Sequence, residues 1–234
     1  MHCFRLLLIL PMLASGGCQF IPQRMPTPPA LQGVAPLQVQ RGGLMGLTGP
    51  MTVGPWKVTD ISVGPWTHRC SHHLVSFDSI GDQSYAFTVP TQEKGLHALC
   101  EIKRSARFYR WNDEPEESGK YSYLECKFHG ASEGNLHLDE TLPKGRKEGR
   151  VTFGALAWKI RSSHGDGDWM DSIDPRGYEI VRGYTVIAAV ETVAGRRIWI
   201  DPALSEEDQQ HIIGIAGALL LYEPPEGYQQ EDCK

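Results

Sequence analysis

The chain has 234 residues, of which 41% are hydrophobic and 22% are charged, with a formal net charge of -5. This length predicts one domain of ordinary size with a packed core, and the composition excludes a disordered or wholly membrane-embedded chain. The acidic balance excludes a nucleic-acid groove, which needs a basic surface to displace counterions.

The N-terminus has the pattern of a secretory signal peptide over residues 1–17. Arg5 supplies a positive charge, Leu6–Leu13 an apolar stretch, and Ala14–Gly17 a run of small residues. The apolar stretch of about 8 residues is much shorter than the roughly 20 that a membrane-spanning helix needs. Removing the signal takes away one base and no acid, so the exported chain is expected to be more acidic still.

The end of the signal resembles the lipobox of bacterial lipoproteins, in which small residues precede a cysteine that is diacylated and becomes the new N-terminus. Gly16 and Gly17 before Cys18 match this pattern, and Ser15 departs from it because the class usually has leucine there. The resemblance implies lipidation of Cys18, and Gln19 resembles members that are sorted to the outer membrane. Ordinary cleavage after Gly16, which would release a free secreted protein, is the alternative.

Residues 18–49 are predicted to be a lipid-anchored tether, because they are rich in Pro, Gln and Gly and keep no helical or strand period. One β-rich domain is expected over residues 50–234. It opens with a ten-residue repeat, in which Trp56 and Trp66 each follow Val-Gly-Pro. Tryptophans at equivalent strand positions usually belong to a core, and stacking against a ligand is the alternative.

Four cysteines remain once the one in the signal is removed and the lipidated one is blocked. An even number in an oxidising compartment predicts two disulfides. Cys100 and Cys126 lie in similar alternating contexts, typical of strands that can face one another, which favours a bridge between them. Cys70 would then pair with Cys233.

Short alternating segments separated by Gly, Pro and Asp dominate the domain and are typical of antiparallel strands. The predicted strands are Tyr85–Val89, Leu96–Ile102, Tyr121–Phe128, Leu136–Leu138, Val151–Phe153, Leu156–Ile160, Tyr178–Val181, Tyr184–Val193 and Arg197–Ile200. No alternation of strands with helices is present. The sequence therefore predicts a mainly β fold, an antiparallel barrel or sandwich.

One helix is predicted, over about 205–222. Ser205 is a favourable N-cap, acids fill the first turn, and Ile212–Tyr222 continues without a charge. An apolar surface on all sides predicts burial of its second half. The order of elements over Tyr184–Tyr222 resembles the tubby-like and LURP-one-related architecture, in which a strand barrel closes around a C-terminal helix. This resemblance implies a non-enzymatic domain with lipid or protein contacts.

A metal site is one candidate for chemistry. His68, Cys70 and His72 would share one face of a strand, and imidazole with thiolate is a ligand set for zinc or copper. Use of Cys70 in a disulfide is the competing interpretation. The carboxylates of Asp166–Asp174 are spaced loosely like a calcium loop, but the required Gly and the distant Glu are missing, which favours a solvated acidic turn.

A serine nucleophile is the other candidate. Gly130-Ala-Ser132-Glu-Gly134 fits the G-x-S-x-G spelling of a hydrolase elbow, in which a strand-to-helix turn presents the serine. Here Asn135–Asp139 follows, and it alternates like a strand. A hairpin loop is therefore favoured, and no catalytic residue is predicted.

The sequence favours a lipid-anchored bacterial envelope protein with a non-catalytic, binding or structural role. Its expected partners are the membrane, through the N-terminal lipid, and another envelope protein or lipid, with no nucleic acid and no cofactor. We expect it at the outer membrane, with the domain in the periplasm or at the cell surface. A metal- or small-ligand-binding periplasmic domain and a serine hydrolase are the alternatives.

Overall fold

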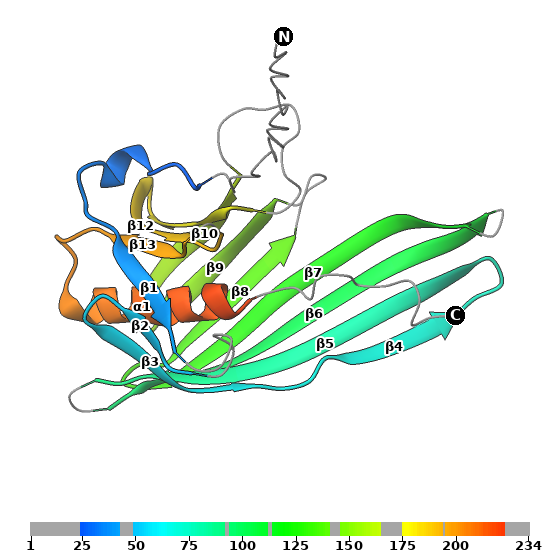
Figure 1. Ribbon diagram of the computed structural model, residues 1–234, viewed down its shortest axis with the longest axis horizontal. Helices are drawn as coiled ribbons and strands as arrows, with labels where there is room; N and C mark the ends of the chain where they lie inside the picture. The colour runs from blue at the N-terminus through cyan, green and yellow to red at the C-terminus, as the bar shows by residue number, and fades with distance from the viewer. Residues whose placement is uncertain are drawn as a thin grey trace, which may run out of the picture.

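The described residues of the computed structural model are 24–42, 49–91, 94–111, 114–140, 146–164, 175–193 and 195–222. They form a closed antiparallel barrel of 12 strands with one α-helix inside it (Figure 1). The predicted mainly β class and the buried C-terminal helix are confirmed. The predicted signal peptide, Cys18, Cys233 and the acidic run Asp166–Asp174 lie outside the described residues.

The elements of the described residues include one 3-10 helix, thirteen strands and one α-helix. They are η1 (Pro29–Leu31), β1 (Leu37–Arg41), β2 (Met51–Val53), β3 (Trp56–Val63), β4 (Thr67–His72), β5 (Ser76–Val89), β6 (Leu96–Trp111), β7 (Glu114–Gly130), β8 (Gly134–Glu140), β9 (Lys147–Phe153), β10 (Leu156–Ser163), β11 (Gly177–Arg182), β12 (Thr185–Glu191), β13 (Arg197–Ile200) and α1 (Glu206–Leu221).

The barrel is built from antiparallel neighbours and closes on itself. Consecutive strands pair from β4 to β13, β13 pairs with β1, and β1 continues through β2 to β3. Closure occurs between β3 and β5, where Ser62 faces Ala86. β4 continues along the same edge of β5, with Thr67 opposite Asp82. Because β3 finds a partner in β5, the barrel leaves neither strand as a free edge at this junction.

Three strands are much longer than the rest. β5, β6 and β7 have 14, 16 and 17 residues, whereas the other strands have 3 to 8. Their far halves leave the barrel together with β4 (Figure 1). We call this part the projecting sheet, and it comprises β4 with Ser76–Ile80, Ser105–Trp111 and Glu114–Tyr121.

α1 fills the barrel. Its N-cap is Ser205, whose Oγ accepts a hydrogen bond from the backbone N–H of Asp208 at 3.1 Å, as the sequence predicts. Every residue from His211 to Leu221 is buried. A Cβ on Gly217 would lie 2.9 Å from Cε2 of Phe87, so glycine is what allows the barrel wall to approach the helix this closely. The space inside the strands is therefore a packed core.

The barrel has two ends, which we name after the helix. The turns β5–β6, β7–β8, β9–β10 and β11–β12 lie at the α1 N-terminal end. The turns β4–β5, β6–β7 and β8–β9, and with them the projecting sheet, lie at the α1 C-terminal end (Figure 1). Among the described residues, no helix combines the length and the apolar character needed to cross a membrane.

Residues 24–41 belong to the folded domain, which corrects the tether predicted over 18–49. β1 pairs with both β2 and β13, and Met25 and Leu31 are buried in a small cluster beside the barrel wall. The sequence does not predict β1 because Leu37 and Val39 are its only apolar residues. The other three are two glutamines and an arginine. So short an alternation is a weak signal in a Pro- and Gln-rich context.

Candidate functional site

A disulfide joins two strands of the barrel wall. Cys100 on β6 and Cys126 on β7 are paired directly across the sheet, with their Cα atoms 4.0 Å apart and both side chains buried. The predicted bridge is confirmed. Cys70 is also disulfide-bonded, and its predicted partner, Cys233, lies outside the described residues.

The predicted metal ligands on β4 have other partners. Nε2 of His68 is 2.8 Å from Oγ of Ser79, and the ring of His72 lies 6.1 Å from that of Phe77. The sulfur of Cys70 is committed to a disulfide and cannot act as a thiolate. In the part of the chain that the structure describes, no three His, Cys, Asp or Glu side chains are grouped to hold a metal ion. The hypothesis of a site at His68, Cys70 and His72 therefore gains no support.

The two repeated tryptophans pack against the main core. Trp56 begins β3 and Trp66 lies between β3 and β4, and each is partly buried against core side chains. The Gly-Pro pairs before them fall where one strand ends and the next begins. Both tryptophans therefore lie against the core, the first of the two positions that the sequence allows.

Ser132 lies in the turn between β7 and β8, as the hairpin interpretation predicts. A histidine is nevertheless in reach, because Oγ of Ser132 is 2.5 Å from Nε2 of His211 on α1. The imidazole stacks on Phe153, with ring centroids 4.0 Å apart and planes 7° apart. His211 is only 2% exposed, and burial lowers its pKa below the usual value of 6.5.

This pair has two parts of a catalytic triad and lacks the third. A serine and a neutral histidine at hydrogen-bond distance could activate a nucleophile. In a working triad, an acid orients the histidine through its other nitrogen. Nδ1 of His211 is buried and has no hydrogen-bond partner among the residues that the structure describes. No strand-to-helix elbow presents Ser132 either, so the geometry is better explained as a contact that holds the turn against α1.

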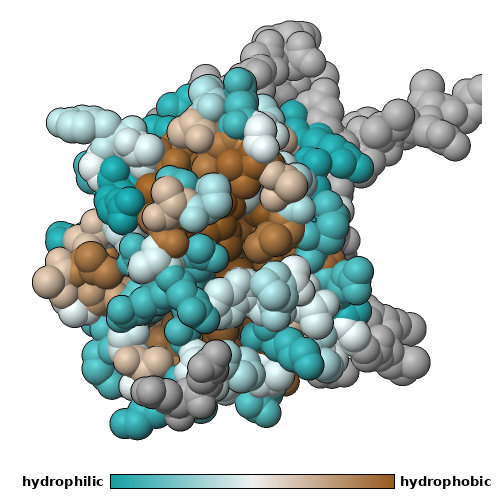
Figure 2. Space-filling view, turned by 90° about the vertical axis from the view of Figure 1, so that its left-hand side faces the viewer, coloured by the Kyte–Doolittle hydropathy of each residue, from teal (hydrophilic) through white to brown (hydrophobic). Residues whose placement is uncertain are grey.

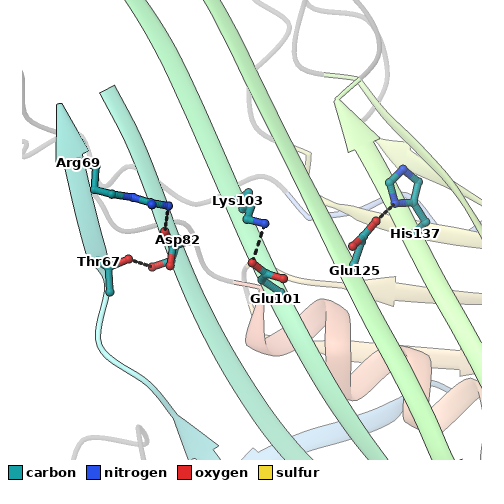
Figure 3. A network of polar contacts seen from close by, with 7 residues as sticks. All are labelled: Thr67, Arg69, Asp82, Glu101, Lys103, Glu125 and His137. Carbon is teal, nitrogen blue, oxygen red and sulfur yellow. Dashed lines mark hydrogen bonds and ion pairs between the residues drawn. The ribbon is translucent and has the colours of Figure 1, made fainter. Parts of the chain in front are cut away.

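The outer face of the barrel and the projecting sheet carries charges of both signs (Figure 3). Arg69 pairs with Asp82 at 3.2 Å, Lys103 pairs with Glu101 at 2.8 Å, and Nδ1 of His137 is 3.1 Å from Glu125. Exposed pairs of this kind contribute about 0–1 kcal/mol each. Their main effect is to make this surface strongly hydrated.

A groove of about 460 Å³ lies among these charges, where β3 leaves the edge of β5. Glu101, Glu125 and Lys127 line it together with Leu99, which is 57% exposed. Both carboxylates already have partners, Lys103 and His137 respectively. The groove therefore offers one apolar contact and mixed charge, without convergent groups for a particular ligand.

Two further surfaces expose apolar side chains. At the tip of the projecting sheet, Leu74 is 102% exposed and Val75 is 54% exposed. Figure 2 looks onto the α1 N-terminal end, where hydrophobic residues gather at the centre and hydrophilic residues surround them. Leu156, the first residue of β10, and Tyr184, in the β11–β12 turn, lie exposed at that end. The tip of the projecting sheet and the α1 N-terminal end therefore offer apolar contacts to a partner, in contrast to the charged outer face.

Comparison with known proteins finds no family model, no curated protein and no solved structure that matches this chain. The geometry of its own residues therefore carries the functional argument. Sequence reasoning identified Ser132 but missed its partner, because His211 is a single histidine in an apolar helix and no spacing relates it to residue 132. It also missed Leu74, whose exposure depends on how far β4 and β5 extend.

Proposed function

We propose that this chain is a bacterial lipoprotein, anchored in the cell envelope through acyl chains on Cys18, whose barrel is a non-catalytic binding module. The N-terminal pattern of Arg5, Leu6–Leu13 and Gly16-Gly17-Cys18 supports export and lipidation. The Cys100–Cys126 disulfide supports an oxidising compartment outside the cytoplasm. The expected localisation is the outer membrane, with the domain in the periplasm or at the cell surface.

The observation that carries the binding role is the filling of the barrel by α1. With His211–Leu221 buried, packed side chains of α1 occupy the middle of the barrel, so a protein partner must meet the outside of the domain. The resemblance to tubby-like and LURP-one-related domains also favours a non-enzymatic role.

We place the binding surface at the tip of the projecting sheet. Leu74 and Val75 are adjacent apolar side chains on a turn that the long strands β4 and β5 hold away from the barrel. Exposed apolar groups at a projecting turn favour contact with a partner, because burying them there removes apolar surface from water. The proposed partner is another envelope protein.

Intact mass of protein purified from bacterial membranes tests the anchor. We expect a mass that begins at Cys18 and carries acyl chains, and we expect Cys18→Ser to abolish both the acylation and the membrane fraction. An unlipidated wild-type chain that begins at Gly17 or earlier would contradict the anchor.

Site-specific photo-crosslinking in cells tests the binding surface. A photoreactive residue at Leu74 should give a discrete crosslinked protein band, and the matched position is Tyr184, which is 105% exposed at the opposite end of the barrel. Leu74→Asp should weaken a crosslink formed from Val75. Equal crosslinking from positions 74 and 184, or no discrete product from either, would contradict a specific surface at the tip.

A serine hydrolase is the second candidate, and the 2.5 Å hydrogen bond between Ser132 and His211 is the observation that favours it. A fluorophosphonate probe reacts with activated serines, so labelling that disappears in Ser132→Ala would establish this activity. Unlabelled wild-type protein would leave the binding module as the function.

A further inference from the structure

A group of polar side chains is buried at the α1 C-terminal end of the barrel. We call Arg104, Ser122, Lys147 and Tyr222 the inner basic cluster. Their exposed fractions are 9%, 0%, 5% and 5% respectively. Two cations are thus about nine-tenths or more withdrawn from solvent, in a chain whose other charged side chains lie mainly outside.

Hydroxyl groups connect three of these side chains, Lys147, Tyr222 and Ser122. Nζ of Lys147 donates a hydrogen bond to Oη of Tyr222 at 3.0 Å and lies 4.4 Å from the centre of its ring. Oη of Tyr222 in turn donates to Oγ of Ser122 at 3.3 Å. Lys147 therefore has a neutral oxygen and an aromatic face as neighbours, which compensate an ammonium charge only in part.

Arg104 lies on the strand next to Ser122, at the position directly opposite it. It is paired with Ser122 across β6 and β7, and residues paired in this way hold their Cβ atoms about 4.5–5.5 Å apart on one face. On its other side, β5 places Gly81 opposite it. Both cross-strand neighbours are small, so neither fills the space beside the long arginine side chain.

The described residues supply no carboxylate to this cluster. Nε of Arg104 is buried without a hydrogen-bond partner, and no described acid forms an ion pair with Arg104 or Lys147. The buried carboxylate of the described core, Glu191, is bonded elsewhere, to Arg197 at 2.7 Å. A buried charge without a counter-charge is costly, and proteins normally pair such charges.

We propose that the inner basic cluster binds an oxyanion, a carboxylate or phosphate group held between Arg104 and Lys147. A guanidinium presents a planar fork of N–H donors that matches two oxygens, and an ammonium adds a compact charge. The positive set excludes a metal cation. This inference does not depend on the proposed lipid anchor or on the partner of the projecting sheet.

Two sources can supply this chemistry. One is a free anion such as inorganic phosphate. The other is the chain itself, because the segment that follows Tyr222 carries four acids, namely Glu223, Glu226, Glu231 and Asp232. Either source would supply negatively charged oxygen atoms to the same donors, and an experiment can separate them.

The experiment is thermal melting of the full, disulfide-bonded chain in increasing inorganic phosphate, against sodium chloride at equal ionic strength. A ligand that binds only the folded state raises the melting temperature in proportion to the logarithm of its concentration above Kd. Arg104→Met and Lys147→Met are the test variants. Arg150→Met is the matched control, because Arg150 is an exposed cation on β9, the strand that carries Lys147.

If free phosphate is the ligand, it raises the melting temperatures of the wild type and of Arg150→Met by more than sodium chloride does. Loss of one charged donor should weaken the apparent affinity by about tenfold or more in Arg104→Met and Lys147→Met. If the acidic segment occupies the cluster, only a variant with its four acids changed to Gln or Asn responds, and adding Arg104→Met weakens that response similarly.

Two results overturn the proposal. One is a phosphate response no larger than that to chloride in both the wild type and the variant without the four acids. The other is a response that keeps full affinity when Arg104 or Lys147 is replaced. Lys147→Met and Arg104→Met are separate tests. If one of the two variants does not fold, the other still tests the proposal.

Discussion

Oγ of Ser132 and Nε2 of His211 share a hydrogen bond of 2.5 Å although the two residues are 79 positions apart in the chain. The bond ties the β7–β8 turn to the buried part of α1. Among the described residues it is also the one polar contact of a buried imidazole, because Nδ1 of His211 has no partner there. The stability of the barrel around its helix should therefore depend on this contact.

We expect Ser132→Ala to lower the free energy of unfolding by about 1–3 kcal/mol, because it leaves both nitrogens of a buried ring without a partner. Urea unfolding followed by tryptophan fluorescence measures the change. Ser71→Ala, at an exposed position on β4, is the control and should stay within about 0.5 kcal/mol of the wild type. Equal midpoints for the two variants would show that the bond does not contribute to stability.

The stability of the fold should fall as the solution becomes acidic. Burial lowers the pKa of His211 in the folded state, whereas the unfolded chain keeps a value near 6.5. Below that pH the unfolded state takes up a proton that the folded state does not bind, so the free energy of unfolding decreases until pH reaches the folded-state pKa.

His211→Phe, which keeps an aromatic ring against Phe153, should remove this contribution. The difference in unfolding free energy between wild type and variant should then change between pH 7 and pH 5. His72→Phe, at an exposed histidine on β4, is the control for exchanging an imidazole for a benzyl ring. If the unfolding free energies of the wild type and His211→Phe depend on pH in the same way, His211 does not make this contribution.

The sequence predicts those parts of the fold that local signals determine. Ser205 with the acids after it marks the start of α1, and the charge-free stretch after His211 marks its burial. Alternation marks the barrel portions of the strands, such as Tyr85–Val89. Similar contexts around Cys100 and Cys126 suffice to predict their bridge.

Other features depend on contacts between distant segments and leave no local signal. Arg104 takes an inward position of β6 where the preceding ones are apolar, so the projecting sheet cannot be predicted from the alternation that predicts Leu96–Ile102. Closure of β3 on β5 is a long-range pairing. The positions of His211 beside Ser132, and of Arg104 beside Ser122, likewise follow only from the complete barrel.

The Cys100–Cys126 disulfide should stabilise the wall of the barrel. Replacing both residues by alanine should lower the free energy of unfolding by at least about 2–4 kcal/mol, since a crosslink restricts the unfolded chain and truncation adds a small cavity. The bridge spans 26 positions and is buried. Guanidinium unfolding in the absence of reductant measures this, and a change below 1 kcal/mol would contradict a stabilising role.

The buried ion pair between Glu191 and Arg197 should be the most sensitive polar contact of the described residues. Nε and Nη2 of Arg197 donate to the two carboxylate oxygens at 2.7 and 3.0 Å, and the backbone N–H of Met25 donates to one of them at 2.9 Å. Glu191 raises the pKa of Arg197 through these bonds. The carboxylate thus holds both β13 and the N-terminal segment to the end of β12.

Glu191→Gln should lower the free energy of unfolding by about 3–5 kcal/mol, because it leaves a poorly hydrated guanidinium without its counter-charge. Glu179→Gln is the matched control: Glu179 pairs with Arg161, whose side chain is 56% exposed, and its loss should cost less than about 1 kcal/mol. Hydrogen exchange should show faster exchange of the Met25 N–H in Glu191→Gln only. Similar losses for the two variants, with unchanged exchange at Met25, would show that the Glu191–Arg197 pair behaves like a surface pair and does not fix the N-terminal segment.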